Sequence, residues 1–207
     1  MQRRIIVKVV AVMLVLGGSL LLGMGTLFAA DKSPAGKPEE ARGPKAIIKT
    51  KFGDMDIVFF PEKAPKHVEN FIALAKSGFY NGTIFHRVIP GFMIQGGDPN
   101  TKDLNKPETY GKGGPKDDKG NPILLKAEFS DTPHKRGIVS MARTPDPNSA
   151  GSQFFVMVGE SPTLDGKYTV FGEVVKGMEA VDKIVKLPRN SRDLPTERVE
   201  MTVVVVE

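Results

Sequence analysis

Short β-prone runs separated by glycine and proline make up most of this chain, and they restrict it to a mainly β fold. Residues 46–51 and 55–60 flank Phe52-Gly53-Asp54, which predicts a β-hairpin. Residues 199–206 are strongly β-prone and predict a further strand. The sequence contains no internal repeat, so this pattern by itself indicates one mixed, mainly β domain.

Two stretches have the spacing of a helix instead. In residues 64–77 the apolar side chains fall on one helical face, with Pro65 near the start and Gly78 as a stop. A second, shorter helix is expected between Gly177 and Pro188, where apolar residues recur at the same spacing.

An uncharged stretch, residues 9–30, follows a positively charged start. This order is typical of an export segment, so residues 1–30 are interpreted as a signal peptide or an uncleaved N-terminal membrane anchor. A cleaved signal peptide is favoured, although about 20 apolar residues suffice to span a bilayer. Either outcome places the domain on the far side of the membrane, in the periplasm or at the exterior. Residues 31–45, with proline and glycine among charges, predict a flexible linker, which leaves 46–207 as the domain.

Charge and cysteine content exclude several classes of function. The pI is about 9.3, but residues 1–30 hold three bases and no acid, which leaves 26 bases against 24 acids in the rest. Such a balance gives little attraction for nucleic acid. The absence of cysteine excludes disulfides and thiol catalysis. The three histidines are dispersed, so neither a metal site nor a cofactor is expected.

The residues that are suited to binding or catalysis are concentrated in three motifs. The first, Phe85-His-Arg-Val-Ile-Pro-Gly-Phe-Met-Ile-Gln-Gly-Gly-Asp98, places a fixed cation, Arg87, and an amide, Gln95, among bulky apolar side chains. This combination suits a site for an uncharged, apolar segment of backbone. The other two are Gly151-Ser-Gln-Phe-Phe155 and Leu164-Asp-Gly-Lys-Tyr-Thr-Val-Phe-Gly172.

Together these motifs resemble those of cyclophilin-type peptidyl-prolyl cis-trans isomerases, and the resemblance covers about residues 46–207. It implies a closed, eight-stranded antiparallel β-barrel capped by two α-helices. It also implies an isomerase that accelerates X-Pro bond rotation in exported proteins and assists their folding. The expected partners are proline-containing peptides and unfolded or folding exported proteins, bound by a monomer without a cofactor or metal.

The residues suit that chemistry because rotation about an X-Pro bond breaks no bond, yet amide resonance gives it a barrier of about 18–20 kcal/mol. As the bond twists, the prolyl nitrogen gains a localised lone pair, which a hydrogen-bond donor can stabilise. The resemblance assigns this catalytic role to Arg87. It implies the following substrate-binding residues: Ile89, Phe92, Met93, Gln95, Gly113, Ala142, Arg143, Thr144, Gln153, Phe155, Leu164 and Tyr168.

Other interpretations remain open. A non-catalytic peptide-binding or holdase module could use the same barrel, and the retained Arg87 favours the enzyme. His86 is interpreted as a packed structural histidine, because the reaction needs no proton transfer. Strand alternation puts Phe154 in the core and Phe155 on the opposite face. The polar segment 100–118 either shapes substrate access or is inert decoration, and decoration is favoured.

The sequence departs from many eukaryotic members of the family at three positions. Thr163 stands in place of a tryptophan, Tyr168 in place of a histidine, and Arg143 in place of an asparagine. Tyrosine keeps an apolar body with a polar tip, so catalysis is expected to survive. Because the indole contact is missing, only weak inhibition by cyclosporin is expected.

Overall fold

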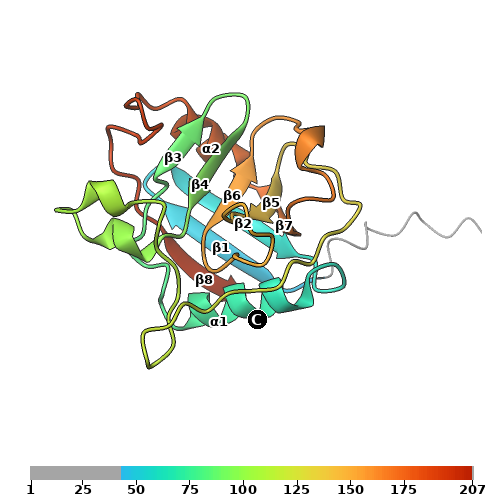
Figure 1. Cartoon of the computed structure of the whole chain (residues 1–207). Coiled ribbons are helices and arrows are strands. Elements are labelled where there is room, and N and C mark those ends of the chain that lie inside the picture. Colours follow the sequence, from blue (N-terminus) through green and yellow to red (C-terminus); the bar gives the residue numbers. More distant parts are fainter. Residues whose placement is uncertain (1–42, 207) are drawn as a thin grey trace, which may run out of the picture. The chain divides into compact units, whose positions relative to one another are not determined.

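The structure, a computed structural model, describes residues 43–206, and these form a mainly β domain as expected (Figure 1). One eight-stranded antiparallel sheet has the order β3-β4-β6-β5-β7-β2-β1-β8. The strands are β1 (Lys45–Thr50), β2 (Gly53–Phe59), β3 (Arg87–Ile89), β4 (Met93–Gly96), β5 (Ile138–Met141), β6 (Phe154–Met157), β7 (Val170–Lys176) and β8 (Thr202–Val206). The helices are α1 (Pro65–Lys76) and α2 (Met178–Val185), with short 3-10 turns η2 (Pro99–Lys102), η3 (Pro107–Thr109) and η4 (Pro162–Leu164).

The expected closure of the barrel is wrong, because the sheet is open between its end strands β3 and β8. A single bridge, Ile84 to Glu200, spans this gap beside a hydrogen bond from the Phe85 N–H to the Val199 carbonyl (3.1 Å). The short β3 cannot extend the ladder there. The Val88 N–H on its outer edge donates instead to the carbonyl of Asp193, in a loop (2.9 Å). A loop therefore covers the edge that closure would have removed.

Helix α1 covers one end of the sheet, and Figure 1 shows α2 at the opposite end. Pro65 occupies the first turn of α1, as its fixed φ and missing N–H favour. Ala64, before the helix, has no side chain that can cap it. Glu128, far along the chain, takes that role by accepting hydrogen bonds from the backbone N–H groups of Lys66 and His67 (both 3.1 Å). It also contacts the buried His67 ring at Nδ1 (2.7 Å).

Buried side chains form two clusters on opposite faces of the sheet. The larger lies under the helices and contains an aromatic group: Phe59, Phe71, Tyr80, Phe85, Phe154 and Phe171. The smaller contains Phe60, Met93, Ile138, Phe155, Met157 and Val170. Phe154 and Phe155 therefore face opposite ways, as the alternation predicted. The smaller cluster supports the site described below.

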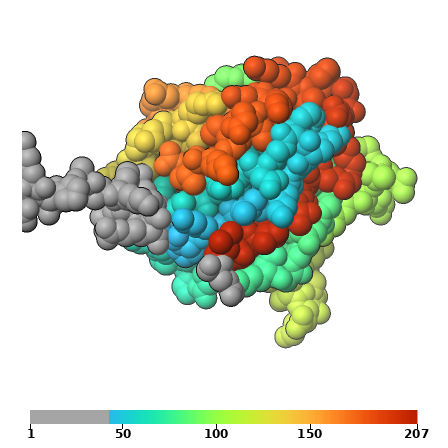
Figure 2. All heavy atoms as spheres, turned by 180° about the vertical axis from the view of Figure 1, so that it is seen from behind, coloured from blue at the N-terminus to red at the C-terminus, as the bar shows by residue number. Residues whose placement is uncertain are grey.

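The domain begins slightly before the expected boundary. Lys45 opens β1 and pairs with Val58 and Val206, and the Phe59 N–H donates to the carbonyl of Pro44 (2.9 Å). Figure 2 shows the neighbouring β1 and β8 on the rear face. The leader and the linker up to residue 42 lie outside the described residues. None of the helices within residues 43–206 has the length and apolar composition needed to cross a membrane.

Candidate active site

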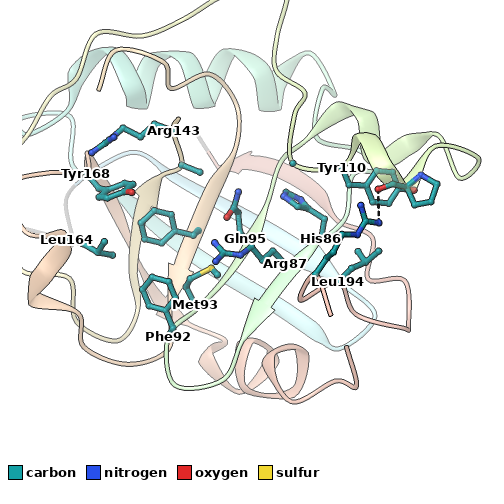
Figure 3. Close-up of a pocket in the computed structure, with 15 residues that line it drawn as sticks. His86, Arg87, Phe92, Met93, Gln95, Tyr110, Arg143, Leu164, Tyr168 and Leu194 are labelled. Atoms are coloured by element: carbon teal, nitrogen blue, oxygen red, sulfur yellow. Dashed lines mark hydrogen bonds between the residues drawn. The ribbon is translucent and has the colours of Figure 1, made fainter. Parts of the chain in front are cut away.

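The three motifs meet at one open cavity of about 490 Å³ (Figure 3). Strands β3, β4 and β6 supply Arg87, Gln95 and Phe155, and η4 supplies Leu164. The full lining is His86, Arg87, Phe92, Met93, Gln95, Pro107, Tyr110, Gly111, Ala142, Arg143, Phe155, Leu164, Tyr168, Arg192 and Leu194. Segments more than 100 residues apart in sequence therefore build a single site.

Arg87 is half-buried at the start of β3, directly opposite Gln95 on β4. Figure 3 shows its guanidinium between Gln95 and Met93, toward the cavity. Its Nε lies 3.8 Å from Oδ2 of Asp193, whose Oδ1 accepts a hydrogen bond from Arg189 Nε (3.1 Å). Asp193 is the one non-glycine residue with a positive φ (61°) in the described part of the chain. A tightly turned loop thus holds a carboxylate beside the arginine.

One wall of the cavity is apolar. Met93 and Phe155 are 1% and 5% exposed, and Phe92 and Leu164 pack against the same cluster. The Phe155 ring meets the Tyr168 ring edge to face, with centroids 5.9 Å apart. This wall offers the dry, flat surface that a small apolar ring requires.

Two glutamines form the polar side. Gln95 Nε2 donates to Gln153 Oε1 (3.0 Å), and Gln153 Nε2 donates to the Gly113 carbonyl (2.8 Å). Each side chain is fixed in orientation by these bonds. Amides carry both donors and acceptors, so the pair can contact peptide groups of a bound chain.

A second cavity of about 530 Å³ adjoins the first and shares Gln95, Gly111, Ala142 and Arg143 with it. The expected site residues Gly113, Thr144 and Gln153 line only this second cavity. Ile89 lines neither cavity, and it packs against the smaller buried cluster instead. The structure therefore does not bring Ile89 into either cavity.

The segment 100–118 is part of the site, contrary to the favoured interpretation as decoration. Pro107, Tyr110 and Gly111 line the first cavity, and residues 111–116 line the second. Buried Asp98 holds this segment by accepting from the backbone N–H groups of Asn100 and Gly111. The aromatic Tyr110 within a polar run was the only sequence signal for this contact.

Arg192 and Leu194 were also missed, and no local pattern marks them. They lie in the loop that carries Asp193, and Arg192 Nη2 donates to the Pro107 carbonyl (3.3 Å). Two loops that are 85 residues apart in sequence are thereby joined at the rim of the cavity.

Arg143 and Tyr168, two of the departures from the family pattern, contact one another. The Arg143 guanidinium lies 4.3 Å from the Tyr168 ring centroid, a cation–π geometry. Its Nε and Nη2 also donate to the Lys167 carbonyl (3.1 and 2.8 Å), and its Nη1 donates to the Thr144 carbonyl (2.9 Å). These bonds fix the wall between the two cavities. Thr163, the third departure, is exposed and lines neither cavity.

His86 lines the cavity but is packed as a structural residue. It is 5% exposed, and neither ring nitrogen has a hydrogen-bond partner in the described part of the chain. Burial lowers the pKa of His86, and the negative charge of Asp98 only partly opposes this effect. The neutral ring is therefore favoured.

His134 joins Asp165 and Ser140 in an arrangement that resembles a hydrolytic triad. Its Nδ1 lies 2.9 Å from Asp165 Oδ1, and its Nε2 lies 3.1 Å from Ser140 Oγ. Ser140 is fully buried, however, and its hydroxyl donates to the Thr169 carbonyl (2.9 Å), so no substrate can reach it. Within residues 43–206 no cluster of His, Asp or Glu could hold a metal ion.

Comparison with known proteins agrees with this geometry. The model of the family "Cyclophilin type peptidyl-prolyl cis-trans isomerase" matches residues 45–206. A probable peptidyl-prolyl cis-trans isomerase of Brucella abortus is 47% identical over 164 residues, which cover 78% of this chain and 79% of that protein. The human peptidyl-prolyl cis-trans isomerase-like 3 is 44% identical over 147 residues, or 70% and 84% of the two chains.

Solved structures give the same result. A cyclophilin type peptidyl-prolyl cis-trans isomerase of Cryptosporidium parvum superimposes with a TM-score of 0.70 at 34% identity, covering 79% of this chain and 98% of that one. A second structure of that protein, in the presence of the dipeptide Ala-Pro, gives a TM-score of 0.69. The match of fold, motifs and sequence over nearly the whole described region shows that this chain belongs to the cyclophilin-type peptidyl-prolyl cis-trans isomerases.

Proposed function

We propose that this isomerase acts on X-Pro bonds of exported proteins and that Arg87 stabilises the twisted amide. The observation that carries the proposal is the position of Arg87, half-buried and facing a cavity whose opposite wall is apolar. The wall of Phe92, Met93, Phe155 and Leu164 receives the proline ring. The preceding peptide group then lies within reach of the arginine and the two glutamines.

Catalysis follows from the change in the prolyl nitrogen as the bond rotates. In the planar amide its lone pair is delocalised, and in the twisted state it becomes a hydrogen-bond acceptor. A donor aimed at that nitrogen therefore stabilises the twisted state more than either ground state. Arginine suits this task because its planar guanidinium presents several fixed donors. Gln95 and Gln153 hold the flanking backbone and take no part in bond rotation.

Binding of a proline-containing peptide is supported by the related Cryptosporidium parvum protein, whose structure was determined in the presence of Ala-Pro. In this chain the ring would lie against Phe155, and the flanking residues would extend past Arg143 into the second cavity. Gly113, Thr144 and Gln153 line that extension.

The test of this mechanism is the substitution Arg87→Ala in the full chain, measured by NMR exchange on an X-Pro peptide. Loss of one charge-assisted hydrogen bond is expected to cost on the order of 1.5–3 kcal/mol, or about 10- to 150-fold in rate. Arg87→Lys should recover only part of this loss, because a single ammonium cannot reproduce the planar fork. Arg136→Ala, which removes a surface arginine paired with Asp182 outside both cavities, is the matched control.

Full activity of a folded Arg87→Ala protein would contradict the role of the arginine. A wild-type protein that binds the peptide without accelerating its isomerisation would instead indicate the non-catalytic peptide-binding or holdase function. Titration of the peptide by NMR separates these outcomes, since it measures binding independently of exchange.

The location is part of the same proposal. The charged start and the uncharged residues 9–30 support export to the periplasm or exterior, either as a cleaved protein or as an anchored one. Cell fractionation with N-terminal sequencing tests it. A mature chain that begins near Ala30 or Asp31 is expected, and full-length chain in the cytosol would exclude export.

A further inference from the structure

The arginines of the described region differ in their partners. Arg136, Arg189 and Arg198 each contact a carboxylate at 2.7–3.1 Å, and Arg87 lies 3.8 Å from Asp193. The remaining two, Arg143 and Arg192, have no carboxylate partner among residues 43–206. Both of these line the first cavity.

Neutral groups hold Arg143 and Arg192 in place instead. Arg143 donates to the carbonyls of Lys167 and Thr144 and lies over the Tyr168 ring. Arg192 donates to the Pro107 carbonyl. Backbone carbonyls orient a guanidinium without cancelling its charge. The two positive charges therefore remain available to a ligand.

The second cavity is also lined by positive charges that have no carboxylate partner in the described residues. Lys112 and Lys116 line it, are exposed, and form no ion pair in the described part of the chain. No aspartate or glutamate lines either cavity. Two acidic side chains near the cavities are already engaged: Asp98 accepts from the backbone N–H groups of Asn100 and Gly111, and Asp193 lies between two arginines.

We infer that this site prefers proline segments flanked by acidic side chains. The inference rests on the proposed isomerase function and names its substrate class. An apolar wall takes the ring, while cations without a carboxylate partner stand on both sides of it: Figure 3 shows Arg143 and Leu194 at opposite ends of the cavity, and Arg192 lies in the same loop as Leu194, two residues before it. A partly enclosed groove lined by charges of one sign concentrates ligands of the other sign. Glutamate or aspartate near the proline meets Arg143 or Arg192 in the first cavity, or Lys112 and Lys116 in the second.

The experiment compares three peptides that differ only in charge. Each is acetylated and amidated and contains Ala-Pro, with glutamate, glutamine or lysine two residues before and one residue after the proline. The value of kcat/KM is measured by NMR exchange with the full chain at low salt. We expect the order glutamate, glutamine, lysine, with about 5- to 20-fold between the extremes, since exposed charge contacts are individually weak. At about 1 M salt, where the Debye length is about 3 Å, the difference should fall below about 2-fold.

Two variants locate the effect. Arg192→Gln should reduce the part of the preference that comes from the first cavity, and Lys112→Gln with Lys116→Gln should reduce the part that comes from the second. The matched control is Lys45→Gln with Lys49→Gln, which removes two exposed positive charges from β1, outside both cavities. This control should keep the preference of the unmodified protein.

The outcomes separate the two proposals. No acceleration of any of the three peptides would contradict the proposed isomerase function. Equal acceleration of all three, or a preference for the lysine peptide, would overturn the charge inference and leave the isomerase function standing. An equal loss of preference in the β1 control would also overturn it, because the effect would then come from total charge and not from the cavities.

Discussion

His86 lies next to Arg87 in the chain and lines the same cavity, yet its surroundings do not suit proton transfer. It is buried without a hydrogen-bond partner in the described region, and burial lowers its pKa. A group with a lowered pKa binds its proton more weakly in the folded than in the unfolded state. Folding stability should therefore be complete above the unfolded pKa of about 6.5 and decline as the pH falls below it.

The lowered pKa of His86 predicts different pH dependences for the isomerisation rate and for thermal stability. The isomerisation rate should stay nearly constant from about pH 6 to 8, because bond rotation transfers no proton. Thermal unfolding, in contrast, should show a falling melting temperature below about pH 6.5, and His86→Phe should flatten that decline. Glu128 and Asp165 have pKa values below their usual range. The stability that they contribute is lost only at a more acidic pH. A step in the rate of the unmodified protein near pH 6.5 that His86→Phe removes would assign His86 a direct role.

At the scale of elements, α1 depends on a residue outside it. Burial by itself would raise the pKa of Glu128, but hydrogen bonds from His67 and from the Lys66 and His67 N–H groups outweigh it and lower the pKa. Glu128→Ala would leave two helix N–H groups and the buried His67 ring without this partner. We expect a loss of about 2–3 kcal/mol in the free energy of unfolding, measured in urea. Glu69→Ala, which breaks only the exposed pair with Lys66, should cost less than about 0.5 kcal/mol, and equal effects would disprove the capping role.

Elements with a local pattern could be predicted from the sequence. The first hairpin and both helices appear within one or two residues of their expected bounds, because turn residues, Pro65 and apolar spacing act over short distances. The site residues on β3, β4 and β6 followed from the family motifs. Closure of the barrel could not be judged, since it depends on how a loop near Asp193 meets Val88. Arg192 reaches the rim of the cavity through a contact with Pro107, 85 residues away, which no local signal encodes, and only the aromatic character of Tyr110 marked its segment.

At the scale of the whole molecule, the two faces of the open sheet have different roles. The larger cluster under α1 and α2 stabilises the fold, and the smaller one supports the cavity. Substitutions in the larger cluster are therefore expected to act through stability, and those in the smaller cluster through the shape of the proline wall as well. Phe154 and Phe155, adjacent in β6, provide the two cases side by side.

The boundary of the domain gives the last prediction. A shortened protein of residues 43–207 keeps Lys45, which pairs on both sides of β1, and Pro44, whose carbonyl accepts the Phe59 N–H. It should match the full chain in kcat/KM, because no residue that lines either cavity precedes His86 in the sequence. A protein of residues 46–207 should also be active but less stable by about 1–2 kcal/mol, the worth of one or two backbone hydrogen bonds. Circular dichroism during urea unfolding measures the difference. If the longer fragment is unfolded or inactive while the full chain is active, residues before Gly43 contribute to the domain, and the proposed separation of leader and catalytic domain is wrong.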